Sequence, residues 1–476
     1  MTAIRLPYRS NPGAYRVEGK PRLVNCYVEP LGNDNKGPHS LQACAGLIPH
    51  ADEVVGGCRG MIWLEDDQKL YAAFGLFLYE VAEDGTKTQV GLIGGTAPVF
   101  MARNDADTTQ VLIASDGKIF SLIDGTLRLQ IYADGDGNSF FADADGDDRA
   151  IVSITQSGGY FVIGLADGTF FATTLNSVET SALRFATAES DPDGLTKAHG
   201  QGNTLYLVGT QSIEVWAISG GADFPFSRVQ GAQLNFGSLS PHTIVDLDQS
   251  VTMVCNDNVV RLISGYQSRV ISSNEVARLI EAEADKATLK AFVHSRGVNK
   301  FYCLQGSGWT REYNVSTGYW HDRVTSVSDQ WLGAYYARAF NKDIFGSSRT
   351  GKTFEGSYTT FLEDGNPMLW GFETETIHAF PDAIQFNRFS IDTETGNGPS
   401  VNEAGELMLD WSDDEGRTWQ GFRRMSLGKK GDYNTVVDAY GLGISGRKGR
   451  VFRVLISDPI TRAIAQIDVD AEPVKL

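Results

Sequence analysis

The chain has 476 residues, of which 42% are hydrophobic and 21% are charged. This composition is typical of a folded protein with one large β architecture or two to three domains. Its 59 acidic and 41 basic side chains give a formal net charge of −18. Because an acidic chain gains little from counterion release, sequence-blind DNA binding is disfavoured, although an acidic wall would let a duplex slide past.

The five cysteines are scattered, odd in number and without a Cys-x-x-Cys motif, which argues against a disulfide framework and a zinc site. The opening segment MTAIRLPYRSNPGAYR lacks the apolar core of a signal peptide. No run of about 18 apolar residues is present that could span a bilayer. We therefore expect a protein that is made in the cytoplasm and has no membrane contact.

Residues 1–55 are rich in Pro, Gly and Asn and carry only weak strand patterning. This pattern predicts an extended N-terminal arm that packs on another surface.

Residues 56–380 repeat a four-strand pattern of alternating apolar and polar positions separated by turn residues. A single four-stranded sheet of this size is too small to bury both faces, whereas radial packing in a closed ring covers the faces and protects the edges. The pattern therefore predicts a β-propeller of six or seven blades, the seventh ending with the strand MLWGFETETI at 368–377. The second strands of the units begin, at a spacing of roughly 40 to 50 residues, near Lys69, Gln110, Gly159, Asn203, Val251, Lys300 and Asp343.

One segment interrupts the strands. Residues 273–292, SNEVARLIEAEADKATLKAF, place apolar side chains at helical spacing from Val276 to Leu289. We expect one amphipathic helix here, inserted between the fifth and sixth blades, with Asn274 as its N-cap. Such a helix either contacts a neighbouring subunit or covers the propeller.

Residues 381–476 contain three further β-rich runs and predict a small β-sandwich-like domain. The motif SDDEGRTW within this domain matches an Asp-box, a hairpin turn in which Asp414 bonds to backbone amides and Gly416 supplies positive φ. Asp-boxes are frequent in sialidases, which makes a sialidase-like hydrolase one alternative. The box itself carries no catalytic group, and no pair of carboxylates is singled out by its spacing. Its defining residues are Ser412, Asp414, Gly416, Thr418 and Trp419.

The acidic segment Asp134–Asp148, DGDGNSFFADADGDD, resembles a calcium loop because Asp134, Asp136 and Asn138 alternate as EF-hand ligands do. Ser139, however, occupies the position that requires Gly, and no helices flank the segment. We interpret it as a solvated loop between blades, with calcium binding as the alternative.

The remaining candidate motifs are weak. Gly351-Lys352-Thr353 echoes a phosphate loop but lacks its first Gly and a following helix. The seven histidines are well separated in the sequence. Trp309, Trp320 and Trp331 are candidates for a glycan-binding pocket, although strand-packing core aromatics explain them better. We therefore predict no catalytic, cofactor-binding or metal-binding residue, and no cofactor.

Three segments carry a resemblance to a known family: 22–47, with RLVNCYVEPLG and LQACAGL; 183–237, which includes GGADFPFSRVQGAQLNFG; and 412–472, from SDDEGRTW to AIAQIDVDAE. In these segments the chain resembles the tail-hub, or packaged-DNA stabilisation, proteins of short-tailed phages (podophages). Ala45-Gly46-Leu47 stands where that family has a Pro-Gly-Leu-like element.

The resemblance implies a structural virion protein of the phage tail without enzymatic activity. It implies a homo-hexameric ring that acts as a head-to-tail connector or nozzle, joins the portal–adaptor ring to the distal tail, and contacts a tail needle or fibre and tailspike proteins. Such a hub extends the DNA channel, stabilises the packaged genome and takes part in genome ejection, while DNA passes without sequence-specific binding. A propeller that binds host glycans is the binding alternative. We expect the isolated protein to be monomeric and to form its ring on the portal.

Overall fold

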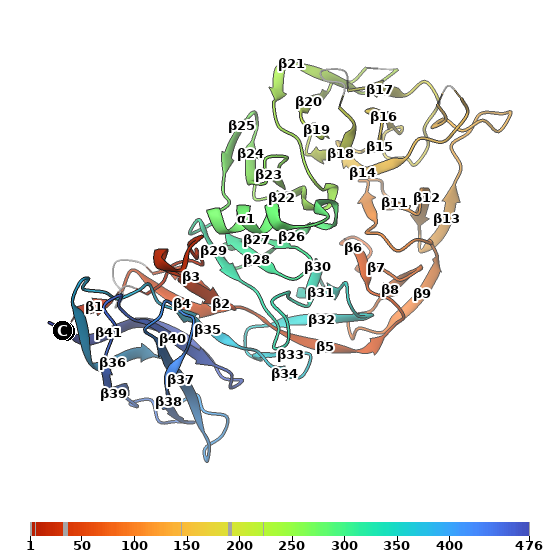
Figure 1. Ribbon diagram of the computed structural model, residues 1–476. Coiled ribbons are helices and arrows are strands. Elements are labelled where there is room, and N and C mark those ends of the chain that lie inside the picture. Colours follow the sequence, from red (N-terminus) through yellow and green to blue (C-terminus); the bar gives the residue numbers. More distant parts are fainter. Residues whose placement is uncertain are drawn as a thin grey trace.

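The computed structural model describes residues 2–4, 6–31, 37–143, 145–188, 193–221 and 223–475. These residues form 41 strands, one α-helix and three short 3-10 turns. Four-stranded antiparallel sheets follow one another around a ring, and a second β domain lies to one side of it (Figure 1). The predicted fold class, an all-β propeller with an inserted helix and a small C-terminal β-sandwich-like domain, is confirmed.

Seven blades are formed by the described residues, one of the two numbers that the repeat spacing allows. Their central strands are mostly buried because neighbouring blades cover both faces. In blade 2, every residue of β11 after Gln110 is buried, whereas the outer strand β13 is mostly exposed. Asp116 and Gly117 both have positive φ in the turn between β11 and β12, as a tight two-residue hairpin requires.

The first three blades hold the strands in chain order from the ring axis outwards. Blade 1 contains β6 (Cys58–Leu64), β7 (Lys69–Phe74), β8 (Phe77–Val81) and β9 (Lys87–Leu92). Blade 2 contains β10 (Phe100–Arg103), β11 (Gln110–Ser115), β12 (Lys118–Ile123) and β13 (Thr126–Gln130). Blade 3 contains β14 (Ile151–Ser157), β15 (Tyr160–Leu165), β16 (Thr169–Ala172) and β17 (Phe185–Thr187).

The next three blades follow the same order. Blade 4 contains β18 (Leu195–Gln201), β19 (Thr204–Gly209), β20 (Ile213–Ile218) and β21 (Phe226–Leu234). Blade 5 follows the 3-10 turn η2 (Pro241–Thr243) and contains β22 (Val245–Leu247), β23 (Ser250–Val254), β24 (Val260–Ser264) and β25 (Gln267–Val270). Blade 6 contains β26 (Lys290–Arg296), β27 (Asn299–Gln305), β28 (Thr310–Asn314) and β29 (Tyr319–Asp322).

Blade 7 is completed by a strand from the start of the chain. Its first three strands are β30 (Gly333–Ala339), β31 (Lys342–Ser347) and β32 (Lys352–Ser357), and its fourth is β5 (Gly46–Glu53), antiparallel to β32. The short strands β33 (Leu362–Glu363) and β34 (Asn366–Pro367) extend this sheet beyond β5. The prediction of 368–377 as the fourth strand is wrong, because β35 (Trp370–Glu373) pairs with strands of the other domain.

Apolar side chains between neighbouring blades close the ring. Leu70 and Phe74 of blade 1 pack with Ile344 and Ala339 of blade 7 in one buried cluster. Corresponding clusters occupy the other interfaces between blades. Burial of these faces is the main driving force that holds the blades in a ring.

The inserted helix α1 (Asn274–Ala282) is shorter than predicted, and Ser273 rather than Asn274 caps it, since Ser273 Oγ accepts the backbone N–H of Val276. After α1 the chain passes through η3 (Lys286–Thr288) and enters β26, the inner strand of blade 6. Its apolar residues Val276 and Ile280 are buried against blades 5 and 6. The helix therefore covers the propeller with this face.

The second domain is a β-sandwich whose two sheets share a large apolar core. One sheet has the order β3-β4-β41-β36-β39, with β1 paired to β41; the other has the order β2-β35-β40-β37-β38 and continues directly from blade 6. Its N-terminal strands are β1 (Thr2–Ile4), β2 (Arg22–Val24), β3 (Cys26–Pro30) and β4 (His39–Ala43), with η1 at Arg16–Glu18. Its C-terminal strands are β36 (Ala383–Thr393), β37 (Ala404–Ser412), β38 (Gln420–Lys429), β39 (Val437–Ile444), β40 (Val451–Ile456) and β41 (Ala463–Val474).

The segment 1–55, expected to be an extended arm, is thus divided between the two domains: β1, β3 and β4 lie in the sandwich, and β5 lies in blade 7. Between them, β2 pairs with β29 of blade 6 on one side and with β35 on the other. The described part of the chain contains no helix with the length and apolar character needed to cross a membrane.

Candidate functional site

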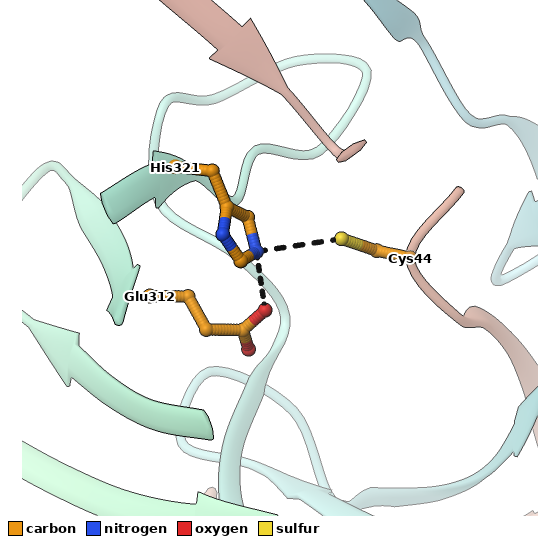
Figure 2. A group of neighbouring side chains, drawn as sticks. All are labelled: Cys44, Glu312 and His321. Atoms are coloured by element: carbon orange, nitrogen blue, oxygen red, sulfur yellow. Dashed lines mark hydrogen bonds and ion pairs between the residues drawn. The ribbon is translucent and has the colours of Figure 1, made fainter. Parts of the chain in front are cut away.

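Buried charged side chains gather where blade 6 meets the N-terminal segment. Glu312 on β28 and His321 on β29 are paired positions of an antiparallel ladder, so their side chains project from the same face of the sheet. Cys44 approaches them from the turn between β4 and β5 (Figure 2). All three side chains are buried.

Hydrogen bonds join this cluster. His321 donates from Nε2 to the Glu312 carboxylate at 2.7 Å, and His294 donates from Nε2 to its other oxygen at 2.6 Å. Cys44 Sγ lies 3.5 Å from His321 Nε2 (Figure 2). Arg323 places Nε 4.0 Å from the same carboxylate and stacks its guanidinium 3.9 Å from the ring centroid of Trp331.

The arrangement favours the charged forms of Glu312 and His321. Burial by itself favours the neutral acid, but the charges and hydrogen bonds of His294 and His321 lower the pKa of the Glu312 carboxyl well below its usual range. Burial likewise disfavours the imidazolium, yet Cys44 and Glu312 together raise the pKa of His321 to about 9. At neutral pH Glu312 is therefore an anion that pairs with the cationic His321 and accepts a second hydrogen bond from His294.

A second buried network lies beside the first. Asp322, at the end of β29, accepts from Arg22 of β2 and lies 3.2 Å from Arg311 of β28. Arg311 in turn donates to Glu275 of α1 at 2.7 Å. The propeller, the helix and the strand leading to the sandwich thus meet at one set of ion pairs.

The first cluster contains side chains of the types that bind metal ions. Among the described residues, one group of potential ligand atoms lies within 4.8 Å of one another, namely those of Cys44, Glu312 and His321. Both carboxylate oxygens of Glu312 already accept hydrogen bonds, one from His294 at 2.6 Å and the other from His321 at 2.7 Å. The cluster is thus built as a buried hydrogen-bonded ion network, and its chemistry is to hold strands together.

The sequence pattern does not indicate that Glu312, His294, Cys44 and Arg323 form one cluster. One signal was available, since Arg311 and Glu312 are adjacent charges in a strand whose five residues are all buried. The histidines are far apart in the sequence, and the fold brings two of them onto one carboxylate.

The Asp-box forms the turn between β37 and β38. Asp414 Oδ1 accepts the backbone N–H groups of Arg417 and Thr418, and Oδ2 accepts the Thr418 hydroxyl at 2.7 Å. These hydrogen bonds lower the pKa of the Asp414 carboxyl. Gly416 has φ 78°, and Trp419 is half-buried beneath the Arg453 guanidinium at 3.9 Å. The polar groups of Asp414 in the Asp-box therefore stabilise the turn itself.

The acidic loop 134–148, described except for residue 144, is organised by two Asx turns. Asp134 Oδ1 accepts the N–H groups of Asp136 and Asn138, and Asp143 Oδ1 accepts those of Asp145 and Asp147. One oxygen of each leading aspartate is thus engaged by backbone, as expected for a self-organised loop.

The other sequence candidates lie in the body of the fold. Lys352 of the Gly-Lys-Thr motif begins β32 and pairs with Asp364 at 3.1 Å. The three tryptophans are at most 8% exposed, and each indole N–H donates inside the protein, to Glu283 from Trp309, to the Ile271 carbonyl from Trp320 and to Glu363 from Trp331. Their faces are not available to a surface sugar.

The fold and this site define a two-domain all-β protein, a propeller joined through one continuous sheet and a buried ion network to a β-sandwich. The family model described as the β-propeller of bacteriophage P22 Gp10 matches residues 24–303, and the model described as the β-sandwich of the same protein matches residues 369–472. The chain belongs to the bacteriophage P22 Gp10 family, the tail-hub and DNA-stabilisation family that its sequence resembles, and is a phage structural protein.

None of the curated proteins compared with the chain matches it. Similar solved structures include the computationally designed Ika8 protein, with 13% identity over 70% of this chain and 99% of that chain, at TM-score 0.37. Another is the WD40 β-propeller domain of Doa1, with 13% identity over 66% of this chain and 97% of that chain, at TM-score 0.41. A third is the extracellular domain of a hybrid two-component system from B. thetaiotaomicron, with 12% identity over 77% and 45%, at TM-score 0.43. These distant likenesses carry no functional argument.

Proposed function

We propose that this protein is the tail hub, or nozzle, of a short-tailed phage virion. In this role it joins the portal–adaptor ring to the distal tail, extends the DNA channel and helps to retain the packaged genome. The observation that carries the proposal is the match of both domains to one phage structural family.

The charge of the chain suits this role. A ring of six copies, each with a net charge of −18, carries about −108 in total. An acidic channel wall repels the phosphate backbone, so the genome passes without sequence-specific binding and without being gripped.

The junction between the domains also suits a part that bears load. A continuous sheet runs from blade 6 through β2 into the sandwich, and buried ion pairs fix the same place. Such a joint keeps two binding surfaces at a fixed relative position. We propose that one surface meets the portal–adaptor ring, that the other meets a tail needle, fibre or tailspike protein, and that no catalytic step is involved.

The test is a nonsense mutation in the gene followed by electron microscopy of the lysate, with the wild-type gene supplied in trans as the control. We expect heads that package DNA and then empty, with portals that lack the distal tail. Full, stable tailed particles that fail to adsorb would instead overturn the hub role and assign the protein to host recognition.

A further inference from the structure

The axis of the propeller contains a cavity of about 280 Å³. It is lined by residues from the first strand of every blade, β6, β10, β14, β18, β22, β26 and β30. A wider space of about 580 Å³ adjoins it and shares His242, Lys290 and Tyr335 with it, so the axial cavity opens at one end of the ring.

The lining of this cavity has the opposite charge to the protein as a whole. The chain has 59 acidic residues, yet the described lining of the cavity and of its mouth includes none of them. It includes Lys197, Lys290, His199 and His242 instead, with Arg59 at the mouth. Arg59 donates to the carbonyl oxygens of Gly94 and Ala97, in the loop between β9 and β10, and to Ser115. The ammonium groups of Lys197 and Lys290 form no ion pair within the described part of the chain.

The two ammonium groups have little to compensate them. The Lys290 ammonium group forms no hydrogen bond or ion pair within the described part of the chain, and its Nζ lies 5.5 Å from the ring centroid of Tyr335. Lys197 donates to the Ile244 carbonyl at 2.8 Å and lies 5.9 Å from the ring centroid of Phe100. Phe100 is stacked on the His242 ring at 4.8 Å, which gives the cavity an aromatic wall between the cations.

The pKa values of these groups are shifted mainly by burial. Burial lowers the pKa of Lys197 and of Lys290 to about 8 each. Burial, and then the charges of both lysines, lower the pKa of His242 to about 3. Asp246, the carboxylate whose charge opposes this shift at Lys197, lies 3.0 Å from His199 Nε2. The three groups therefore sit close together and share a positive potential.

We propose that the axial cavity binds a small oxyanion, a phosphate or a carboxylate, held by the ammonium groups of Lys197 and Lys290 beside the Phe100 and His242 rings. Desolvated cations without an anionic partner in an ion pair are costly, and an anion that accepts charge-assisted hydrogen bonds from both of them offsets that cost. This site lies on the propeller axis, away from the junction of the domains, and it does not depend on the hub role.

The test is isothermal titration calorimetry of the full chain with inorganic phosphate and, separately, with citrate, each against sodium chloride at equal ionic strength. We expect saturable binding of at least one probe, and the comparison tells a phosphate ligand from a carboxylate ligand. Lys290→Met removes the charge but keeps the length of the side chain, and we expect it to weaken binding by at least about tenfold.

Two variants sharpen the result. Lys290→Arg keeps a cation and should keep binding, whereas Lys118→Met, which alters the exposed lysine at the start of β12, should bind as the wild type does. Lys197→Met serves as the second charge-removing variant if Lys290→Met does not fold. Absence of saturable binding of both probes by the wild type would overturn the proposal, and so would equal binding by wild type and charge-removed variants.

Discussion

Arg22 donates from Nε to Oδ2 of Asp322 at 2.8 Å, at the place where the sheet of blade 6 continues into the sandwich. The Asp322 side chain is fully buried and also lies 3.2 Å from Arg311, which binds Glu275 of the helix α1. One carboxylate therefore holds together the N-terminal segment, the propeller and the helix that covers it.

Asp322→Asn should destabilise the whole protein by about 3–5 kcal/mol, because it removes the anion of the partly buried Arg22 and leaves the buried Arg311 with Glu275 as its remaining carboxylate partner. Urea unfolding would measure this loss. The matched control is Asp248→Asn, which removes an exposed ion pair with Lys300 and should cost less than about 1 kcal/mol. Equal effects of the two substitutions would show that Asp322 does not stabilise the junction between the propeller and the sandwich.

Gly351→Ala should weaken the closure of the ring. The backbone carbonyl of Gly351 accepts from the N–H of Val54, just beyond β5, and a Cβ at residue 351 would overlap the Val54 carbonyl oxygen. Because the obstacle is backbone, relief requires movement of the closing strand, at about 1–3 kcal/mol. Thermal unfolding measures this cost, and limited proteolysis should show earlier cleavage near residue 54.

The control for that substitution is Gly135→Ala, since a Cβ at residue 135 meets nothing within 4 Å. Its midpoint should stay within the range of a neutral surface change, about 0.5 kcal/mol. A Gly351→Ala protein as stable and as resistant to protease as this control would contradict the importance of the closure.

The sequence was sufficient to predict blades 1 to 6 because each of them is a local meander, and apolar runs such as Val111–Ala114 followed by Asp116-Gly117 signal strand and turn within a few residues. It did not predict the outer strand of blade 7, because β5 pairs with β32 across almost the whole propeller and its own pattern is weak. The predicted helix was too long for a similar reason. The apolar spacing of residues 283–292 also fits the turn and strand that blade 6 requires.

The charged groups of the interior were less predictable. Lys197 in LTKAHGQ and Lys290 in KAFVHSR occupy the polar positions of alternating strands, which normally face water. That this polar face points to the ring axis depends on the closure of all seven blades. The same limit applies to His294 and His321, whose shared carboxylate is a product of strand register.

His321 should remain protonated at pH 8, where an ordinary histidine is neutral, because Cys44 and Glu312 raise its pKa to about 9 against the effect of burial. The raised pKa means that its contribution to stability is complete below about pH 6.5 and is lost as the pH rises through 9. That contribution is about 3 kcal/mol. NMR of ¹⁵N-labelled histidine would report the protonation state directly.

The stability effect is isolated by comparing the wild type with His321→Gln in urea at pH 6.5 and pH 9.5. Lys197 and Lys290, with lowered pKa values, add stability as the pH rises above 8, but they are present in both proteins and cancel in the difference. The advantage of the wild type should shrink with rising pH. A difference that is the same at both pH values would argue against a protonated His321.

The last prediction concerns the sandwich as a folding unit. The segment 369–476 should not fold alone, because its sheets lack β1, β2, β3 and β4, and its core lacks Leu23, Cys26, Val28 and Leu41, which the N-terminal segment supplies. Exposed core surface of this size leads to unfolding or aggregation.

Joining residues 1–45 after residue 476 through a flexible linker of about ten residues, which spans at most about 36 Å, should restore a folded domain. This linkage is geometrically reasonable because β1 pairs with β41 near the end of the chain. Dispersed amide NMR signals from the permuted protein, and their absence from the fragment, are the expected outcome. A cooperatively folded 369–476 fragment would show that the N-terminal strands are dispensable to the sandwich.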